Sequence, residues 1–206
     1  DSNWRRGQLA VHSRWGNDVT VLLGDYLYIK SMGLALSRDT LDVVRLLCDA
    51  HRLLLEGARG AGKQPGELRL SQNWIGGTRP GNAVFVPPPP ERVADLLADL
   101  ERFVHDAASD VPPLVKVALI HAQFETIHPF LDGNGRIGRL LIAALFEYWS
   151  LLREPLLYLS GYLKQHQGEY YRRLSTIRSD GDWEGWVSFF LEGIATATAD
   201  AERSII

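Results

Sequence analysis

The chain has 206 residues, a formal charge of −3 and a hydrophobic content of 46%, which suit one ordinary domain with or without an appended segment. The slight acidic excess argues against a nucleic-acid-binding protein, and no apolar run approaches the roughly 20 residues of a membrane-spanning helix. Because Cys48 is the only cysteine, no internal disulfide can form, and we expect a cytoplasmic protein.

The first third of the chain mixes helical patterns with a segment rich in turn residues. Val19–Leu36 is a long apolar stretch that is compatible with a helix. Thr40–Leu55 is a clearer helix, because Asp39 or Thr40 can cap it and its apolar residues recur at helical spacing. Residues 57–90 contain Gly-Gly and Pro-Gly pairs, which are typical of turns, and residues 83–86 (AVFV) are typical of a short strand. A small β-hairpin is therefore expected within residues 57–90.

From Glu91 onward the sequence is helical in character. Val93, Leu96, Leu97, Leu100 and Phe103 share one face of a first helix. Further helices are expected from the Pro112-Pro113 pair to about Ile127, from near Arg136 to about Tyr148, and over residues 160–178 and 182–202. The expected fold class is mainly α, with one small β element.

Two glycine-containing stretches resemble phosphate-binding motifs only superficially. GARGAGKQ, residues 57–64, lacks the Ser or Thr of a P-loop and follows a helical rather than a strand pattern. GNGRIG, residues 133–138, satisfies the dinucleotide-binding spacing, but no strand precedes it. His121 is interpreted as a packing or hydrogen-bonding residue, since too few further metal ligands lie near it in the sequence.

The densest group of functional side chains is HPFLDGNGRIGR, which runs from His128 to Arg139. Gly133 and Gly135 allow main-chain N–H groups to approach a ligand closely. The next helix begins near Arg136, so its unpaired N–H groups face the same space. Arg136 and Arg139 are neighbours on one side of that helix and are suited to gripping phosphate oxygens. The stretch predicts an anion-binding site.

Two residues of this stretch carry additional chemistry. Asp132 offers a carboxylate to a magnesium ion that keeps phosphate and water ligands. His128 titrates near neutral pH in its unperturbed form, which makes it the natural general base. The alternative interpretation is a capped helical corner with solvated arginines, but the combination of base, carboxylate, glycines and paired arginines favours a functional site.

The same stretch matches, at every defined position, the pattern H-x-F-x-(D/E)-G-N-G-R-x-x-R that is typical of the Fic family. The resemblance covers about residues 42–192 and includes PGELRLSQNWIGGTRPGNAVFVPPPP, which is similar to the family's flap region. It implies a Fic-type helical domain over residues 42–206 and transfer of AMP from ATP to a Ser, Thr or Tyr hydroxyl of a target protein. Removal of AMP, transfer of another phosphate-containing group, or a catalytically silent nucleotide-binding module remain alternatives.

The resemblance also implies roles for the motif residues. His128 would deprotonate the target hydroxyl, Phe130 would anchor the loop, and Asp132 would bind Mg²⁺. The phosphates of ATP would be held by the remaining defined positions, which are Gly133, Asn134, Gly135, Arg136 and Arg139. Within this group Asn134 would orient the α-phosphate, and the two arginines would hold the β- and γ-phosphates.

Two positions bear on how such a site is completed or controlled. Gln167 stands where relatives often carry a basic residue, which leaves the contacts to the nucleotide base open. Many Fic proteins are inhibited by the Glu of a helix with the pattern (S/T)-x-x-x-E-(G/N), and SFFLEG, residues 188–193, fits it. Its apolar neighbours indicate a core-packing helix instead, so we expect Glu192 not to be inhibitory.

The first 41 residues resemble a different family. Arg5-Arg6-Gly7 and Gly24-Asp25-Tyr26 are similar to a fragment of a trans-polyprenyl diphosphate synthase. The chain lacks both Asp-rich motifs that hold the Mg-diphosphate in that family, so prenyl transfer is not expected. Residues 1–41 are therefore predicted to be an appended helical segment.

Overall fold

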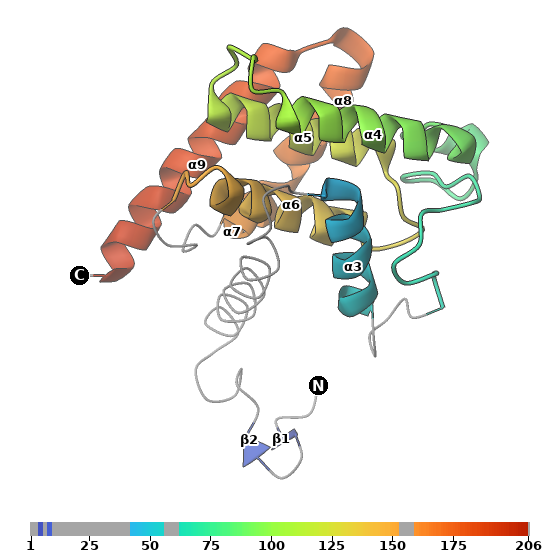
Figure 1. Ribbon diagram of the computed structural model, residues 1–206, viewed down its shortest axis with the longest axis horizontal. Helices are drawn as coiled ribbons and strands as arrows, with labels where there is room; N and C mark the ends of the chain where they lie inside the picture. The colour runs from blue at the N-terminus through green and yellow to red at the C-terminus, as the bar shows by residue number, and fades with distance from the viewer. Residues whose placement is uncertain (1–3, 6–7, 10–41, 56–61, 153–158, 206) are drawn as a thin grey trace.

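The computed structural model describes residues 4–5, 8–9, 42–55, 62–152 and 159–205 (Figure 1). The expectation of a mainly α protein is confirmed for this part of the chain. Its helices are α3 (Val43–Leu55), α4 (Val93–His105), α5 (Pro113–Ile127), α6 (Asn134–Tyr148), α7 (Leu159–Gln165), α8 (Gln167–Asp180) and α9 (Trp183–Ile205), with short 3₁₀ turns at Pro80–Asn82 and Pro90–Arg92. None of the described helices is both long and apolar enough to cross a membrane.

Helix α5 forms the centre of the domain. It packs against α4, α6 and α9, while α3 packs on α4 and α6 (Figure 1). Val117, Ile120 and Phe124 are fully buried, because apolar residues lie on nearly every side of this helix. The indole Nε1 of the fully buried Trp186 in α9 donates a hydrogen bond to the Ala118 carbonyl of α5 (2.9 Å). The carboxyl end of α5 is therefore held firmly in place, and with it the residues that follow from His128 onward.

The expected helix over residues 160–178 is divided in two. Helix α7 ends at Gln165 and α8 begins at Gln167, with a turn at His166. Both the main-chain nitrogen and Nδ1 of His166 lie near the Tyr162 carbonyl, at 2.9 and 3.0 Å. Because the imidazole competes for the acceptor that the helix uses, the chain turns at this position.

The expected β-hairpin is not confirmed. Ile75 and Phe85 form one isolated antiparallel bridge, and no longer strand pairing occurs in the described residues 62–90. Ile75 N–H donates to the Phe85 carbonyl, and the N–H groups of Val84 and Phe85 donate to the Ile75 carbonyl. Turns at Gly76 and Gly77 and the prolines from Pro87 onward keep the pairing short, since proline has no N–H to donate. We refer to residues 66–89 as the flap segment.

Most of the expected appended segment, including the apolar run Val19–Leu36, lies outside the described residues. Its described parts are two strands of two residues, β1 (Trp4–Arg5) and β2 (Gln8–Leu9), which pair antiparallel with Trp4 opposite Leu9.

Candidate functional site

The twelve-residue motif is a tight loop between α5 and α6. His128 ends α5 in the left-handed conformation (φ 50°, ψ 61°), and its N–H donates to the Phe124 carbonyl. Gly133 precedes α6 with φ 81° and ψ 0°, which glycine adopts without a steric cost. These two left-handed residues bring the carboxyl end of one helix next to the amino end of the other.

Phe130 and Asn134 hold this loop closed from inside. Phe130 is fully buried, as expected for the anchor of the loop, and Asn134 is 2% exposed. The Asn134 side chain accepts a hydrogen bond from Phe130 N–H (2.9 Å) and donates one to the Phe130 carbonyl (2.7 Å). Since both ends of the Asn134 amide bond the main chain of Phe130, its first-turn N–H group is the part of Asn134 that can face an anion.

A buried histidine on α3 supports the other side of the loop. The imidazole of His51 stacks on the Phe130 ring, with the ring centroids 4.0 Å apart and an interplanar angle of 13°. Its Nδ1 accepts the Gly66 N–H (2.9 Å), so Nε2 carries the hydrogen and donates to the Asp132 carbonyl (3.0 Å). Burial lowers the pKa of His51, and the neutral ring can therefore keep this arrangement near pH 7.

Arg69 joins the flap segment to the loop. Its guanidinium group, on a residue only 1% exposed, donates from Nε to the His128 carbonyl (2.9 Å) and from Nη2 to the carbonyls of Pro88 and Ile127. Its main-chain N–H donates to the Pro129 carbonyl (2.9 Å), and the side chain of Asn73 donates to the Phe130 carbonyl (3.0 Å). The flap segment thus fixes the main chain on either side of His128.

A second arginine completes this junction from α8. Arg178 donates from Nη2 to the main-chain oxygen of Glu125 (3.1 Å), and its guanidinium carbon lies 3.8 Å from the centre of the Phe85 ring. This cation–π contact connects α8 and the carboxyl end of α5 to the flap segment.

The two motif arginines fold back over the loop. A nitrogen of Arg136 lies 3.6 Å from the position of a Cβ built on Gly133, and a nitrogen of Arg139 lies 3.4 Å from one built on Gly135. Neither arginine forms an ion pair with another of the described residues. With the unpaired N–H groups of the first turn of α6, they form a cationic cradle suited to an anion with several oxygens.

Asp132 lies half-buried at the entrance to this cradle. Its Oδ1 accepts the Gly133 N–H (2.6 Å), which leaves Oδ2 for another ligand. The described residues contain no cluster of three or more Asp, Glu, His or Cys side chains of the kind that would bind a metal without help. A single carboxylate beside a phosphate site does fit Mg²⁺, because this ion usually keeps waters and substrate phosphates among its ligands.

His128 is held as a neutral imidazole. Burial lowers its pKa to about 4; Arg178 and Arg69 act in the same direction, and the Glu125 main chain opposes them. The ring is therefore in its basic form at neutral pH, as a general base must be. Its buried Nδ1 makes no hydrogen bond of good geometry with any described residue, although the main-chain carbonyl of Glu125 lies close enough to raise the pKa.

The remaining sequence predictions have different outcomes. His121 is fully buried and hydrogen-bonds the Gly138 carbonyl and the Tyr170 hydroxyl, as expected of a structural histidine. Gln167 is exposed and donates only to the Tyr171 hydroxyl (3.3 Å) among the described contacts. Glu192 is exposed on α9, and its charge acts on Tyr162 of α7. That Glu192 is not inhibitory stays a prediction.

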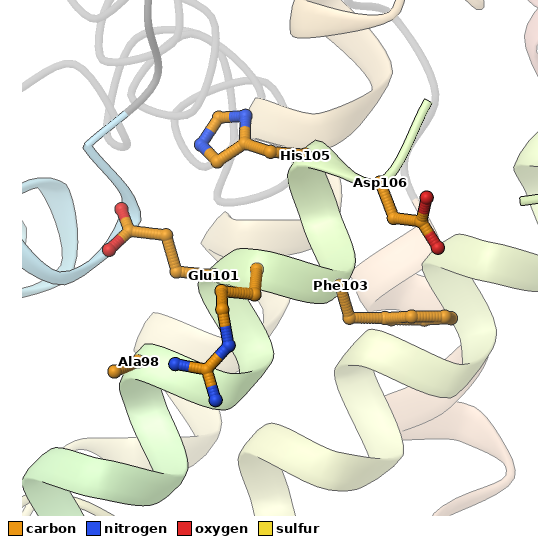
Figure 2. A pocket seen from close by; sticks show the side chains of 6 residues that line it. Ala98, Glu101, Phe103, His105 and Asp106 are labelled. Carbon is orange, nitrogen blue, oxygen red and sulfur yellow. The ribbon is translucent and has the colours of Figure 1, made fainter. Parts of the chain in front are cut away.

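A hollow on the surface lies apart from the motif loop. Figure 2 shows it beside the carboxyl-terminal half of α4, where the Glu101 side chain also accepts the first N–H of α3. It contains none of the motif residues and is lined by Ala98, Glu101, Arg102, Phe103, His105 and Asp106. We assign it no function.

Sequence reasoning did not identify several residues that shape the site. They are His51, Arg69, Asn73, Glu125, Tyr170 and Arg178. An isolated arginine in a Gly- and Pro-rich segment looks solvated in sequence, and nothing in the helical pattern of α3 separates His51 from an ordinary core position. The stretch FETIHPF placed Glu125 one turn before His128, which was the only local indication of its role.

The close approach of α5 to α6 depends on Gly138. A Cβ on this residue would lie 2.4 Å from Glu125 Oε1 and 3.1 Å from atoms of both His121 and Phe124. Gly138→Ala is therefore expected to lower the free energy of unfolding by about 1–3 kcal/mol, although alanine favours helix formation.

The matched control is Gly168→Ala in α8, where no atom lies within 4 Å of the new Cβ. That change should be neutral or stabilise the protein by up to about 1 kcal/mol. Chemical denaturation of both variants tests the contact, and equal stability of Gly138→Ala and the unmodified protein would contradict it.

Comparison with known proteins agrees with this geometry. Residues 40–146 match the Fic/DOC family, whereas residues 1–63 match the polyprenyl synthetase family. The adenylyltransferase Fic of Drosophila ananassae is 29% identical over 90% of this chain, and that of Drosophila melanogaster is 28% identical over the same share. The chain spans only 34% and 35% of these two relatives.

Solved structures show the same fold. A Fic family protein from Desulfovibrio desulfuricans G20 superimposes with a TM-score of 0.71 at 30% identity, over 96% of this chain and 56% of its own. Fic-1 from C. elegans superimposes with a TM-score of 0.67 at 22% identity, over 98% of this chain and 53% of its own. Since the family match covers more than half of the chain and includes the whole motif loop, this protein belongs to the Fic/DOC family.

Proposed function

We propose that this protein transfers AMP from ATP to a Ser, Thr or Tyr hydroxyl of a target protein. The observation that carries the proposal is the juxtaposition of a neutral, half-buried histidine with a cationic cradle in one loop. The Drosophila relatives are protein adenylyltransferases, which supports the same reaction.

In this reaction His128 takes the proton of the target hydroxyl as its oxygen attacks the α-phosphorus of ATP. The new bond joins that oxygen to phosphorus, and the bond to the leaving pyrophosphate breaks in line with it. Because the pKa of His128 is lowered to about 4, the ring is ready to accept a proton at neutral pH. The rigid loop supplies orientation, which accounts for a large part of such catalysis.

The phosphates would lie on the loop and the first turn of α6. Asn134 and Gly135 would contribute main-chain N–H groups, and Arg136 and Arg139 would contribute guanidinium groups, while Gly133 provides the left-handed turn that places them. Asp132 would hold Mg²⁺ together with phosphate and water oxygens, and the ion would neutralise phosphate charge. ATP and Mg²⁺ are thus the proposed co-substrate and cofactor.

We also propose the boundaries and setting of this activity. Residues 42–206 would form the Fic domain, and residues 1–41 would be an appended segment without prenyl-transfer activity, since the chain lacks the Asp-rich motifs. The partners would be ATP and target proteins rather than nucleic acid or membrane. A cytoplasmic location is in keeping with a single cysteine.

The reaction is tested by incubating the protein with Mg²⁺, a cell lysate and ATP labelled either at the α- or at the γ-phosphate. Label on protein from α-labelled ATP alone supports AMP transfer, and label from γ-labelled ATP indicates phosphoryl transfer instead. Loss of AMP from an already modified protein would identify the removal reaction. Binding of ATP without any transfer would identify a silent nucleotide-binding module.

Arg136→Ala is expected to weaken ATP binding by about 10- to 100-fold, because one charge-assisted pair of hydrogen bonds is lost. Titration of ATP by calorimetry, in the presence of Mg²⁺, measures the change. Arg102→Ala on α4 is the matched control, since it removes an exposed arginine outside the motif and should leave the affinity unchanged. Equal affinities of all three proteins would remove Arg136 from the cradle.

A further inference from the structure

Two neighbouring side chains behind the motif loop each have a buried polar atom without a hydrogen-bond partner among the described residues. These atoms are His128 Nδ1 and Glu125 Oε1, and the distance from His128 Nδ1 to the other carboxyl oxygen of Glu125 is 4.0 Å. The two side chains are only 19% and 8% exposed. Because a buried polar group without a partner costs about 1–3 kcal/mol, this pair calls for a functional explanation.

The carboxyl group of Glu125 is enclosed by charged and titratable groups from three helices. Its ionisation is affected by Arg139 of α6 and by Arg178 and Tyr170 of α8. His121 lies on the same helix, α5, and His128 lies directly after it. Oε1 also packs directly on Gly138, as the 2.4 Å separation from a built Cβ indicates. The carboxyl group therefore cannot turn toward solvent without moving α6.

The assignment of hydrogen atoms to the groups around Glu125 identifies His128 as the donor to its carboxylate. His121 Nδ1 lies 3.1 Å from the Gly138 carbonyl, which only accepts, so this nitrogen carries the ring hydrogen. With a pKa lowered by burial to about 3, His121 is neutral, and its Nε2 must accept the hydrogen of the Tyr170 hydroxyl at 3.0 Å. The Tyr170 hydroxyl also lowers the pKa of Glu125, but it has a single hydrogen, which it shares with His121. Nδ1–H of His128 is the nearest remaining donor.

We propose that Glu125 is the positioning residue of His128: its carboxylate accepts Nδ1–H of the ring and thereby presents Nε2 as the base. This inference rests on the proposed transfer of AMP. During the transfer, the hydroxyl proton moves to Nε2, the new oxygen–phosphorus bond forms and pyrophosphate leaves. Glu125 stays ionised and stabilises the imidazolium, and the separation of 4.0 Å shortens when the substrates bind.

The ionisation of Glu125 gives the proposal a measurable pH dependence. Burial raises the pKa of Glu125 to about 7, against the opposing effects of Arg139, Arg178 and the Tyr170 hydroxyl. The accepting carboxylate thus forms as the pH rises through about 7, and transfer should increase over the same range. Were His128 acting alone, the increase would come near its own pKa of about 4.

The test compares Glu125→Gln and Glu125→Asp with the unmodified protein and with Glu147→Gln, a control at the opposite end of α6. Transfer from α-labelled ATP to the target labelled by the unmodified protein gives kcat, KM for ATP and the pH profile. For Glu125→Gln we expect kcat to fall by about 10- to 100-fold with KM unchanged, and the increase near pH 7 to disappear. Glu125→Asp should retain that increase with an intermediate kcat, and the control should match the unmodified protein.

A second measurement does not depend on activity. The ring nitrogens of His128 are observed by ¹⁵N NMR and assigned by their loss in His128→Ala. In the unmodified protein above pH 7, Nδ1 should carry the hydrogen, and Glu125→Gln should redistribute it between the two nitrogens.

The proposal would be overturned if the tautomer, kcat and the pH profile were all unchanged in Glu125→Gln. If Glu125→Gln does not fold, Glu125→Asp decides it through kcat, since a kcat equal to that of the unmodified protein would overturn the proposal. Absence of transfer by the unmodified protein would contradict the proposed function instead, while the NMR result would still test Glu125.

Discussion

Replacing His128 by alanine is expected to abolish AMP transfer while ATP binding persists. The change removes the base that accepts the hydroxyl proton, and this should lower the transfer rate by a factor on the order of 10²–10⁴. The cradle is untouched, because its main-chain and guanidinium groups come from Gly133 to Arg139 and not from the imidazole. Single-turnover transfer from α-labelled ATP measures the rate, and calorimetry measures the affinity for ATP.

The conformation of the loop needs its own control in this experiment. His128 has φ 50°, a left-handed conformation that asparagine tolerates better than alanine does. His128→Asn should therefore match His128→Ala in its loss of transfer and be the more stable of the two. Transfer at the unmodified rate by either variant would show that another group accepts the proton.

Arg69→Met is expected to cause the largest loss of stability among single changes outside the hydrophobic core. It leaves the carbonyls of His128, Ile127 and Pro88 without their donor in a place that water hardly reaches, and each unsatisfied group costs about 1–3 kcal/mol. Removal of a buried charge offsets part of this cost. A net decrease of about 3 kcal/mol in the free energy of unfolding is expected, together with a decrease in transfer, because the His128 carbonyl is no longer held.

Chemical denaturation measures the change, with Arg102→Met as the matched control. Arg102 has a side chain that is 74% exposed and pairs with Asp99 on the surface, so its loss should change stability by less than about 0.5 kcal/mol. Arg69→Lys separates charge from geometry, since lysine keeps the charge but cannot reproduce the planar fork. If Arg69→Met were as stable as the control, the guanidinium contacts would not be what fixes the flap segment.

The match to two families within one chain has a structural counterpart at α3. The polyprenyl synthetase match extends to residue 63 and the Fic/DOC match begins at residue 40, so α3 (Val43–Leu55) lies in both. The structure uses this helix as part of the Fic core, because it contributes His51 to the motif loop and packs Val43 and Leu47 into the interior. A regular amphipathic helix can satisfy both patterns, since each requires apolar residues at the same spacing.

Much of the fold was predictable from local patterns. The helices over residues 93–105, 113–127 and 134–148 form where they were expected, and the prolines at positions 112 and 113 lie at the start of α5 as expected. Only one pair of flap residues, Ile75 and Phe85, bridges where a hairpin was expected, because the bonds of this segment go to the motif loop instead. A partner so distant in sequence leaves no periodic pattern to detect.

The sequence by itself determined the chemistry of this protein, through His128, Asp132 and the two arginines, which are packed into twelve residues. The motif is local, so spacing alone brings its groups together. Only the tertiary structure decided what surrounds them: Arg69 and Arg178 on the main chain, His51 beneath Phe130, and Glu125 behind the base. These contacts join residues of different helices and the flap segment, and burial sets the pKa of His128 and of Glu125. These contacts and these pKa values depend on packing between distant segments, which no local sequence pattern encodes.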